Sequence, residues 1–234
     1  MKVMLSHFSN KQNKSQKEYE MQYFYQNNNS HDLIVFFSGW GCDYHQFTNL
    51  HDQKDVLILY DYQDLTLDFD LKKYENIDII AYSAGVFVAS IFAQNIPHVR
   101  QKVALCGNPY LFDKKLGISQ ENIRVFKEIT LDNYLDFRRK YMVVSDEEYE
   151  KYNRLESLRT IESCATELET LQKLYAERKE QINPHFDIAV VAENDLIFNL
   201  AAQKDFYQDK LRVIKNAKHH IFFRFNSFED ILKL

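Results

Sequence analysis

Residues 77–86 constrain the fold of this 234-residue chain more than any other segment. They read IDIIAYSAGV: an apolar, β-branched run leads into a serine between small residues, and an apolar helix-like stretch follows. This is the pattern of a nucleophile elbow, G-x-S-x-G, with Ala81 in place of the first glycine. In such an elbow the serine lies on a strained strand-to-helix turn, so bulky side chains two residues away would collide with neighbouring backbone. Ser83 is therefore a candidate nucleophile.

A second motif precedes the elbow. Residues 32–37 (DLIVFF) predict a short buried strand, and the glycine-containing loop SGWGCD follows it at 38–43. Glycine allows backbone angles that turn N–H groups inward. In a hydrolase with this elbow, the loop and the residue after the serine supply the two donors of the oxyanion hole. We expect these donors to be the backbone N–H groups of Trp40 and Ala84; the alternative is that Trp40 is only a core or rim aromatic residue.

An acid and a base follow two later strand candidates. Residues 186–192 predict a strand with Asp195 just past its end, and the short strand 211–214 precedes His219 and His220. The order Ser, Asp, His is that of α/β hydrolases. In this constellation the serine attacks a carbonyl, the histidine takes its proton, and the aspartate orients the imidazole. Each residue has an ordinary alternative as a turn or loop residue, but all of them occupy the expected strand ends in the expected order.

Composition limits the class of protein. Hydrophobic residues make up 45% and aromatic residues 15%, which excludes a disordered chain. The net charge of −5 argues against general nucleic-acid binding. We find no run of 18 apolar residues and no long apolar segment of a signal peptide at the N-terminus. The three cysteines, Cys42, Cys106 and Cys164, predict reduced thiols in a cytoplasmic protein. Since no Cys/His cluster has zinc-site spacing, we expect no metal and no cofactor.

Strand candidates alternate with helix patterns along the chain, which predicts an α/β protein with a mainly parallel central sheet and helices on both faces. Together with the elbow and the order Ser, Asp, His, this predicts the α/β-hydrolase fold. Further strands are expected at 1–8, 19–26, 56–60 and 103–106, and a buried helix at 86–96. Between 113 and 183 charged residues become frequent, and helical spacing appears at 134–141 and 168–175. We therefore predict a hydrolase core at 1–112 and 184–234 and a helical cap insertion at 113–183. A cap would shape a hydrophobic passage above Ser83; the alternative is a helical excursion that only covers the sheet.

Three segments together resemble a known family. FFSGWG at 36–41, AYSAGV at 81–86 and HHIFFRF at 219–225 are similar to the BioG-type pimeloyl-[acyl-carrier protein] methyl ester esterases. The resemblance implies a cytoplasmic enzyme of biotin biosynthesis that hydrolyses the methyl ester of pimeloyl-ACP and releases methanol. It also implies that Ser83 is the nucleophile, Asp195 the triad acid, and Trp40 and Ala84 the oxyanion donors. It runs over most of the chain, although the cap carries no specific motif.

The histidine pair leaves two candidates for the general base. Related hydrolases have one histidine followed three residues later by phenylalanine, and both His219 and His220 meet this rule. We favour His219, because it also lies nine residues before Phe228, which suits an aromatic anchor for the last helix. His220 remains the alternative.

The resemblance further implies an acyl-carrier protein as partner. Such carriers are acidic, so basic residues of the predicted cap are docking candidates: Arg138, Arg139, Lys140, Arg154 and Arg159. For each of them the alternative is a solvated helix face. We expect no nucleic-acid or membrane partner, and the oligomeric state stays open with a monomer favoured. Competing functions are a general carboxylesterase or thioesterase for small acyl esters and a non-catalytic, hydrolase-like ligand-binding protein.

Overall fold

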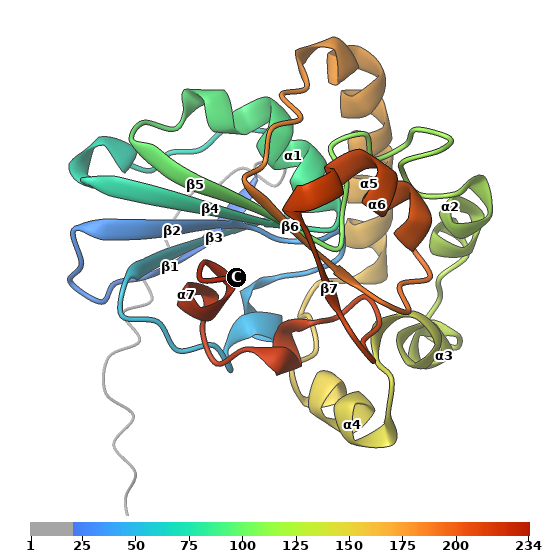
Figure 1. The fold of residues 1–234 in the computed structure, drawn as a ribbon. Helices are drawn as coiled ribbons and strands as arrows, with labels where there is room; N and C mark the ends of the chain where they lie inside the picture. The colour runs from blue at the N-terminus through green and yellow to red at the C-terminus, as the bar shows by residue number, and fades with distance from the viewer. Residues whose placement is uncertain (1–20) are drawn as a thin grey trace, which may run out of the picture.

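A seven-stranded sheet forms the centre of the molecule, with the strand order β1-β3-β2-β4-β5-β6-β7 (Figure 1). The computed structural model describes residues 21–234, so the strand predicted at 1–8 lies outside the described residues. β1 pairs antiparallel with β3, and every other neighbouring pair is parallel. The strands are β1 (Gln22–Gln26), β2 (Asp32–Phe37), β3 (Asp55–Tyr60), β4 (Asn76–Tyr82), β5 (Val99–Leu105), β6 (Ile188–Ala192) and β7 (Leu211–Ile214).

Both faces of the sheet are covered by apolar side chains. Along β2, Val35 and Phe37 belong to one core cluster, and Ile34 and Phe36 belong to the other. Because both alternating sets of side chains are buried, β2 has a continuous apolar sequence rather than an alternating one. The prediction of a mainly parallel central sheet with both faces covered is therefore confirmed.

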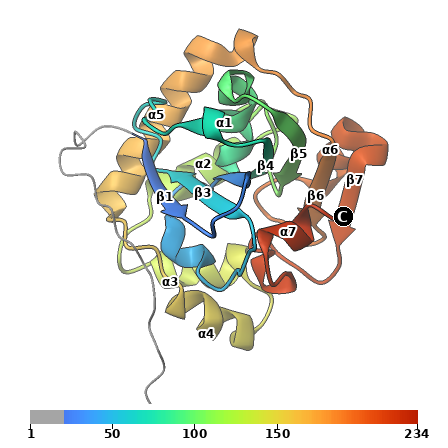
Figure 2. The same cartoon turned by 90° about the vertical axis from the view of Figure 1, so that its left-hand side faces the viewer.

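Different helices cover the two faces (Figure 2). α1 (Ala84–Phe92), α5 (Ile161–Arg178) and α6 (Leu200–Tyr207) contribute to the first cluster, whereas the second includes residues of η1 (Tyr44–Phe47) and α7 (Phe228–Ile231). The predicted anchor Phe228 is 2% exposed and packs against the ring of Phe36. The remaining short helices are η2 (Leu71–Lys73), η3 (Ala93–Asn95), η5 (Lys179–Gln181), η6 (Gln208–Lys210) and η7 (Phe222–Arg224).

The chain between β5 and β6 is largely helical. It contains α2 (Gln120–Lys127), α3 (Tyr134–Phe137), the π-helical turn η4 (Arg138–Met142), α4 (Asp146–Arg154) and α5. Ser119, Ser145 and Thr160 cap α2, α4 and α5 by accepting a backbone N–H three residues ahead, which explains where these helices begin. The helix predicted at 134–141 is thus α-helical only as far as Phe137.

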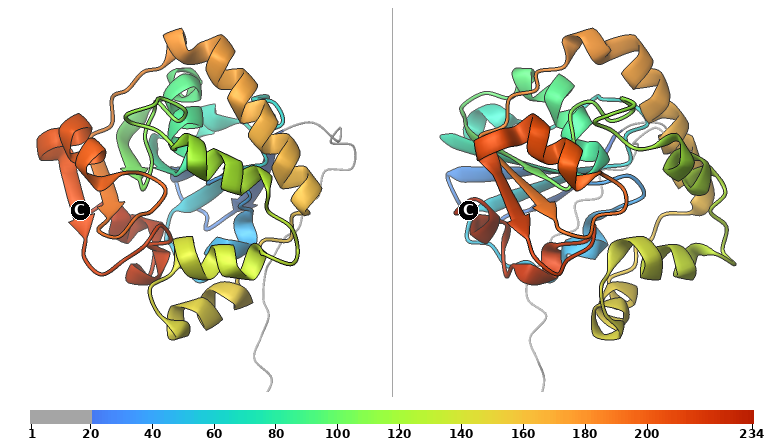
Figure 3. Two further views of the ribbon diagram at one scale, coloured as in Figure 1. Left: turned by 90° about the vertical axis from the view of Figure 1, so that its right-hand side faces the viewer. Right: turned by 45° about the vertical axis from the view of Figure 1, so that its right-hand side comes forward.

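α2 and α3 lie beyond the carboxyl ends of the parallel strands, at the right in Figure 1, and α4 lies at the bottom of the view. In both views of Figure 3, α5 (orange) and α2 (green) lie next to each other. The division into a core and a cap at 113–183 stays a prediction. Within residues 21–234, none of the helices has the length and hydropathy needed to span a bilayer.

Candidate active site

Ser83 occupies the turn between a strand and a helix. β4 ends at Tyr82 and α1 begins at Ala84, which leaves Ser83 alone at the junction with φ 55° and ψ −122°. A non-glycine residue in such a region costs about 1–3 kcal/mol and persists only where the surrounding structure imposes it. Its N–H donates to the carbonyl of Leu105 in β5 (2.9 Å), which holds the turn in place. The segment therefore has the geometry expected of a nucleophile elbow.

Two glycines allow the backbones to approach at this turn. A Cβ on Gly85 would lie 2.3 Å from the carbonyl oxygen of Phe37, and one on Gly107 would lie 2.5 Å from the carbonyl oxygen of Ser83. The motif predicted the need for a small residue at Gly85. It did not predict the close approach at Gly107, whose position directly after a strand is the only sign of it in the sequence.

A chain of hydrogen bonds joins Ser83, His219 and Asp195. His219 Nε2 lies 2.9 Å from Ser83 Oγ, and His219 Nδ1 lies 2.8 Å from Asp195 Oδ2. Asp195 Oδ1 accepts the N–H groups of Ile197 (2.8 Å) and Phe198 (3.2 Å), which leaves Oδ2 free to face the imidazole. The side chains of His219 and Asp195 are 3% and 2% exposed. The arrangement suits proton transfer from the serine to an imidazole that a buried carboxylate orients.

His220 has different surroundings from its neighbour. Its ring packs against Tyr152, Phe222 and Phe223, and its Nε2 has no hydrogen-bond partner among the described residues. Burial, with a smaller contribution from His219, lowers the pKa of His220 to about 3. The structure thus brings His219, and not His220, to Ser83 and Asp195.

Backbone contacts with the π-helical turn hold the histidine loop. The N–H of His219 donates to the carbonyl of Tyr141 (3.3 Å), and that of His220 donates to the carbonyl of Met142 (3.0 Å). The hydroxyl of Tyr82 donates to the carbonyl of His219 (3.2 Å). These contacts were not predicted, because backbone groups carry no sequence signature.

The two expected oxyanion donors lie beside Ser83. Trp40, Ala84 and Ser83 line the same cavity. Ala84 is the first residue of α1, where backbone N–H groups have no partner within the helix. Among the described residues nothing accepts the N–H of Trp40, whereas its indole Nε1–H donates to the carbonyl of Cys164 (2.6 Å). Both backbone N–H groups are therefore free to bind a developing oxyanion.

The cavity above Ser83 has a mainly apolar wall. Residues of the core and of the helical segment 113–183 contribute to it, and the ring of Trp40 stacks on Phe126 at its side. Such a wall suits an acyl chain whose ester group reaches Ser83. The apolar lining includes Leu111, Phe112, Ile118, Phe126, Ile129, Phe137, Met142, Leu168, Leu171 and Ile197.

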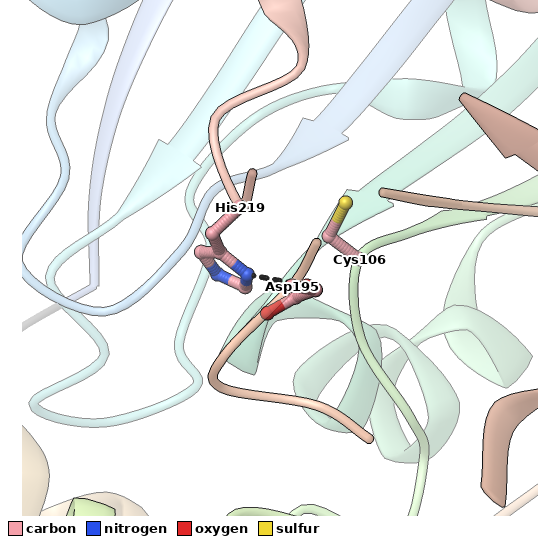
Figure 4. Close-up of side chains that lie close together, drawn as sticks. All are labelled: Cys106, Asp195 and His219. Atoms are coloured by element: carbon pink, nitrogen blue, oxygen red, sulfur yellow. Dashed lines mark hydrogen bonds and ion pairs between the residues drawn. The ribbon is translucent and has the colours of Figure 1, made fainter. Parts of the chain in front are cut away.

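Cys106 lies beside the same carboxylate, as Figure 4 shows. Candidate ligand atoms of Cys106, Asp195 and His219 lie within 4.8 Å of one another, which raises the question of a metal site. Burial, followed by the charge of Asp195, raises the pKa of the Cys106 thiol well above its usual value. Since Ser83 and Asp195 already engage both nitrogens of His219, the cluster fits a hydrogen-bonded acid–base site better than a metal site.

The expectation that Arg138 and Arg159 present exposed docking charges is wrong. Their side chains are 1% and 6% exposed. Arg138 lies over the ring of Tyr134 and pairs with Glu156, and Arg159 pairs with two carboxylates. Such pairing lets an arginine be buried on a helix-rich segment whose composition suggests a solvated face. Arg139, Lys140 and Arg154 are exposed, as predicted.

Comparison with solved structures defines the class. A lipase-esterase related protein from Clostridium acetobutylicum shares the fold with a TM-score of 0.60 at 20% identity, over 86% of this chain and 92% of that one. BioG from Haemophilus influenzae superimposes with a TM-score of 0.79 at 29% identity, over 90% of this chain and 99% of that one. The protein is thus a hydrolase of the α/β-hydrolase superfamily.

Sequence comparison then defines the family. The model of the pimeloyl-ACP methyl esterase BioG family matches residues 20–231, and the chain belongs to this family of carboxylic ester hydrolases. An uncharacterized protein of Haemophilus influenzae is 32% identical over 213 residues, covering 89% of this chain and 97% of that protein. A malonyl-[acyl-carrier protein] O-methyltransferase of Bacteroides fragilis is 30% identical over 187 residues, but the match covers only 36% of that longer protein.

Proposed function

We propose that this enzyme cleaves the methyl ester of pimeloyl-ACP with Ser83 as nucleophile, His219 as general base and Asp195 as the orienting acid. The observation that carries the proposal is the continuous hydrogen-bonded path from Ser83 Oγ through both nitrogens of His219 to Asp195, beneath an apolar cavity. Membership of the pimeloyl-ACP methyl esterase family supports the substrate.

The reaction follows from this geometry in two halves. His219 Nε2 accepts the proton as Ser83 Oγ attacks the ester carbonyl, and the carboxylate of Asp195 stabilises the resulting imidazolium. The N–H groups of Trp40 and Ala84 bind the oxyanion, and methanol leaves with the proton from His219. Water then attacks the acyl-enzyme with His219 as base again, which releases free pimeloyl-ACP and restores Ser83.

The carrier partner is part of this proposal. Among the candidate arginines of the helical segment, Arg139 and Arg154 are exposed, and we assign them a share in the docking of the acidic carrier. We also place the enzyme in the cytoplasm. In support, Cys42, Cys106 and Cys164 are free thiols, as is usual in a reducing compartment.

Three variants test the proposed triad. Ser83→Ala and His219→Ala should each lower kcat for pimeloyl-ACP methyl ester by about 10³-fold or more, because triad members act as a unit. His220→Gln is the matched control: the neighbouring imidazole touches neither Ser83 nor Asp195, so most of the activity should remain. Methanol release measures turnover, and a fluorophosphonate probe measures labelling of Ser83. A folded Ser83→Ala variant that keeps its activity would refute the assignment.

A further inference from the structure

Helix α5 holds the loop that carries the predicted oxyanion donor Trp40. The indole Nε1–H of Trp40 donates to the carbonyl of Cys164 (2.6 Å), and the N–H of Gly41 donates to Glu167 Oε2 (2.9 Å). A Cβ on Gly41 would lie 3.4 Å from Cys164 Sγ, so the loop and the helix are in close contact. The helix therefore contacts this loop through the carboxylate of Glu167 and through the carbonyl and thiol of Cys164.

Glu167 also connects this loop to the segment after β3. Its side chain is fully buried, and its second oxygen accepts the N–H of Tyr62 (3.1 Å). The hydroxyl of Tyr62 in turn donates to the carbonyl of Ser38 (2.9 Å), at the start of the loop that carries Trp40. One carboxylate thus fixes the loop directly at Gly41 and indirectly at Ser38.

Arg159 balances the charge of this buried carboxylate. Its guanidinium pairs with Glu167 through Nη1 and with Asp61 through Nη2 (2.6 Å), and it also lines the cavity. An unpaired carboxylate beside an oxyanion hole would oppose the negative charge that develops there during the reaction. The pair with Arg159 lets a carboxylate hold the loop without this electrostatic cost.

Gly41 explains why the loop needs such a contact. Its φ is 71°, in the left-handed region, and glycine occupies other backbone regions about as readily. The acceptor on Glu167 selects one orientation of the Trp40–Gly41 peptide. The neighbouring peptide, which carries the Trp40 N–H, then has a fixed direction beside Ser83.

We propose that Glu167 is a positioning residue for the oxyanion hole: it holds the Gly41 N–H and thereby directs the Trp40 N–H toward the reacting carbonyl. The inference rests on the proposed function. A positioning role can be distinguished from a purely structural role, because a positioning residue stabilises the transition state more than the bound substrate. Its loss should therefore lower kcat and leave KM nearly unchanged.

The test uses Glu167→Gln and Glu167→Ala in the full-length enzyme. Glu167→Gln keeps one acceptor oxygen and should lower kcat about 10-fold, and Glu167→Ala removes the acceptor and should lower it about 100-fold. KM for the ester should stay within about two-fold in both. The affinity for an acyl trifluoromethyl ketone, whose adduct with Ser83 carries an oxyanion, should fall by about the same factor as kcat. If Glu167→Ala does not fold, the kcat of Glu167→Gln and its affinity for the trifluoromethyl ketone still test the positioning role.

Asp55→Asn provides the matched control. Asp55 is also a buried carboxylate that accepts two backbone N–H groups, those of Asn28 (2.8 Å) and Ser30 (3.1 Å). It is the first residue of β3, however, and so lies at the amino end of the parallel strands, away from Ser83. This variant should lose stability and keep kcat. Equal kcat losses in Asp55→Asn and Glu167→Gln, or a rise in KM without a fall in kcat, would overturn the positioning role. An active wild type with unchanged Glu167 variants overturns only this inference, whereas an inactive wild type overturns the proposed function itself.

Discussion

At the scale of single residues, His219 and His220 show how far two adjacent identical side chains can differ. His219 lies between Ser83 and Asp195 with both nitrogens in hydrogen-bond range. His220 is 4% exposed among aromatic rings and has no partner for Nε2 in the described structure. Burial without a partner disfavours the charged form, so His220 is neutral in the folded protein at neutral pH.

The neutral state of His220 predicts an acid-sensitive stability. The folded pKa of about 3 lies below the ordinary value of 6.5, so the unfolded chain binds a proton first as the pH falls. The contribution of His220 is complete above pH 6.5, and lowering the pH from 7 to 5 should reduce the free energy of unfolding by about 2 kcal/mol. Urea unfolding of the wild type and His220→Gln at both pH values measures the difference. An equal loss in the two proteins would mean that His220 titrates normally.

At the scale of secondary-structure elements, the active site depends on the close crossing of α1 over β2. Gly85, in the first turn of α1, lies so near the end of β2 that a methyl group would meet the Phe37 carbonyl oxygen at 2.3 Å. Backbone atoms in a central strand cannot move aside as a flexible side chain can. The small residue is therefore a condition for placing Ser83, as well as part of the motif.

Gly85→Ala should destabilise the protein by about 3 kcal/mol through overpacking and should lower activity as α1 moves. The midpoint of thermal or urea unfolding measures the first effect, and kcat measures the second. Gly39→Ala is the comparison, because the nearest atoms to its Cβ are side-chain atoms of Tyr82 and Ser83 at 3.0–3.2 Å rather than backbone. It should cost less stability, and similar unfolding midpoints for Gly85→Ala and the wild type would contradict the crossing argument.

At the scale of the whole molecule, the distribution of arginines decides which charges a carrier protein can meet. Arg138 and Arg159 are buried in ion pairs, whereas Arg154 is exposed and Arg139 is 56% exposed although it pairs with Asp146. Charges at a solvent-exposed rim act mainly on the association rate, and salt screens them over about 8 Å at physiological ionic strength. A test of carrier docking must therefore use the two exposed arginines, Arg139 and Arg154.

Replacing Arg139 and Arg154 together by alanine should raise KM for pimeloyl-ACP methyl ester about three- to ten-fold at low salt and less at high salt. Hydrolysis of a small free ester should stay nearly unchanged, because that substrate does not contact the outer surface of η4 and α4, which carry the two arginines. Steady-state kinetics with both substrates at two salt concentrations measures the effect. Equal losses on both would indicate damage to the fold, and no loss on either would place the carrier elsewhere.

The local parts of this protein were predictable from the sequence alone. An elbow needs only a buried strand, a serine between small residues and a helix, all within about ten consecutive residues, so Ser83 and Ala84 are recognisable in the pattern. The parallel sheet follows in the same way from short apolar runs that alternate with helical spacing. The order of Ser83, Asp195 and the histidine pair is likewise a property of the linear chain.

Long-range contacts decided the rest. The sequence favoured His219 but kept His220 as the alternative, and the hydrogen bonds of the His219 ring to Ser83 and Asp195 separate the two. The burial of Arg159 depends on its partners Asp61 and Glu167. A charged residue in a polar segment has the same local sequence pattern whether it faces solvent or a buried carboxylate from a distant part of the chain. Because the free energy of a buried charge depends on the partners that folding brings to it, only the tertiary structure separates these cases.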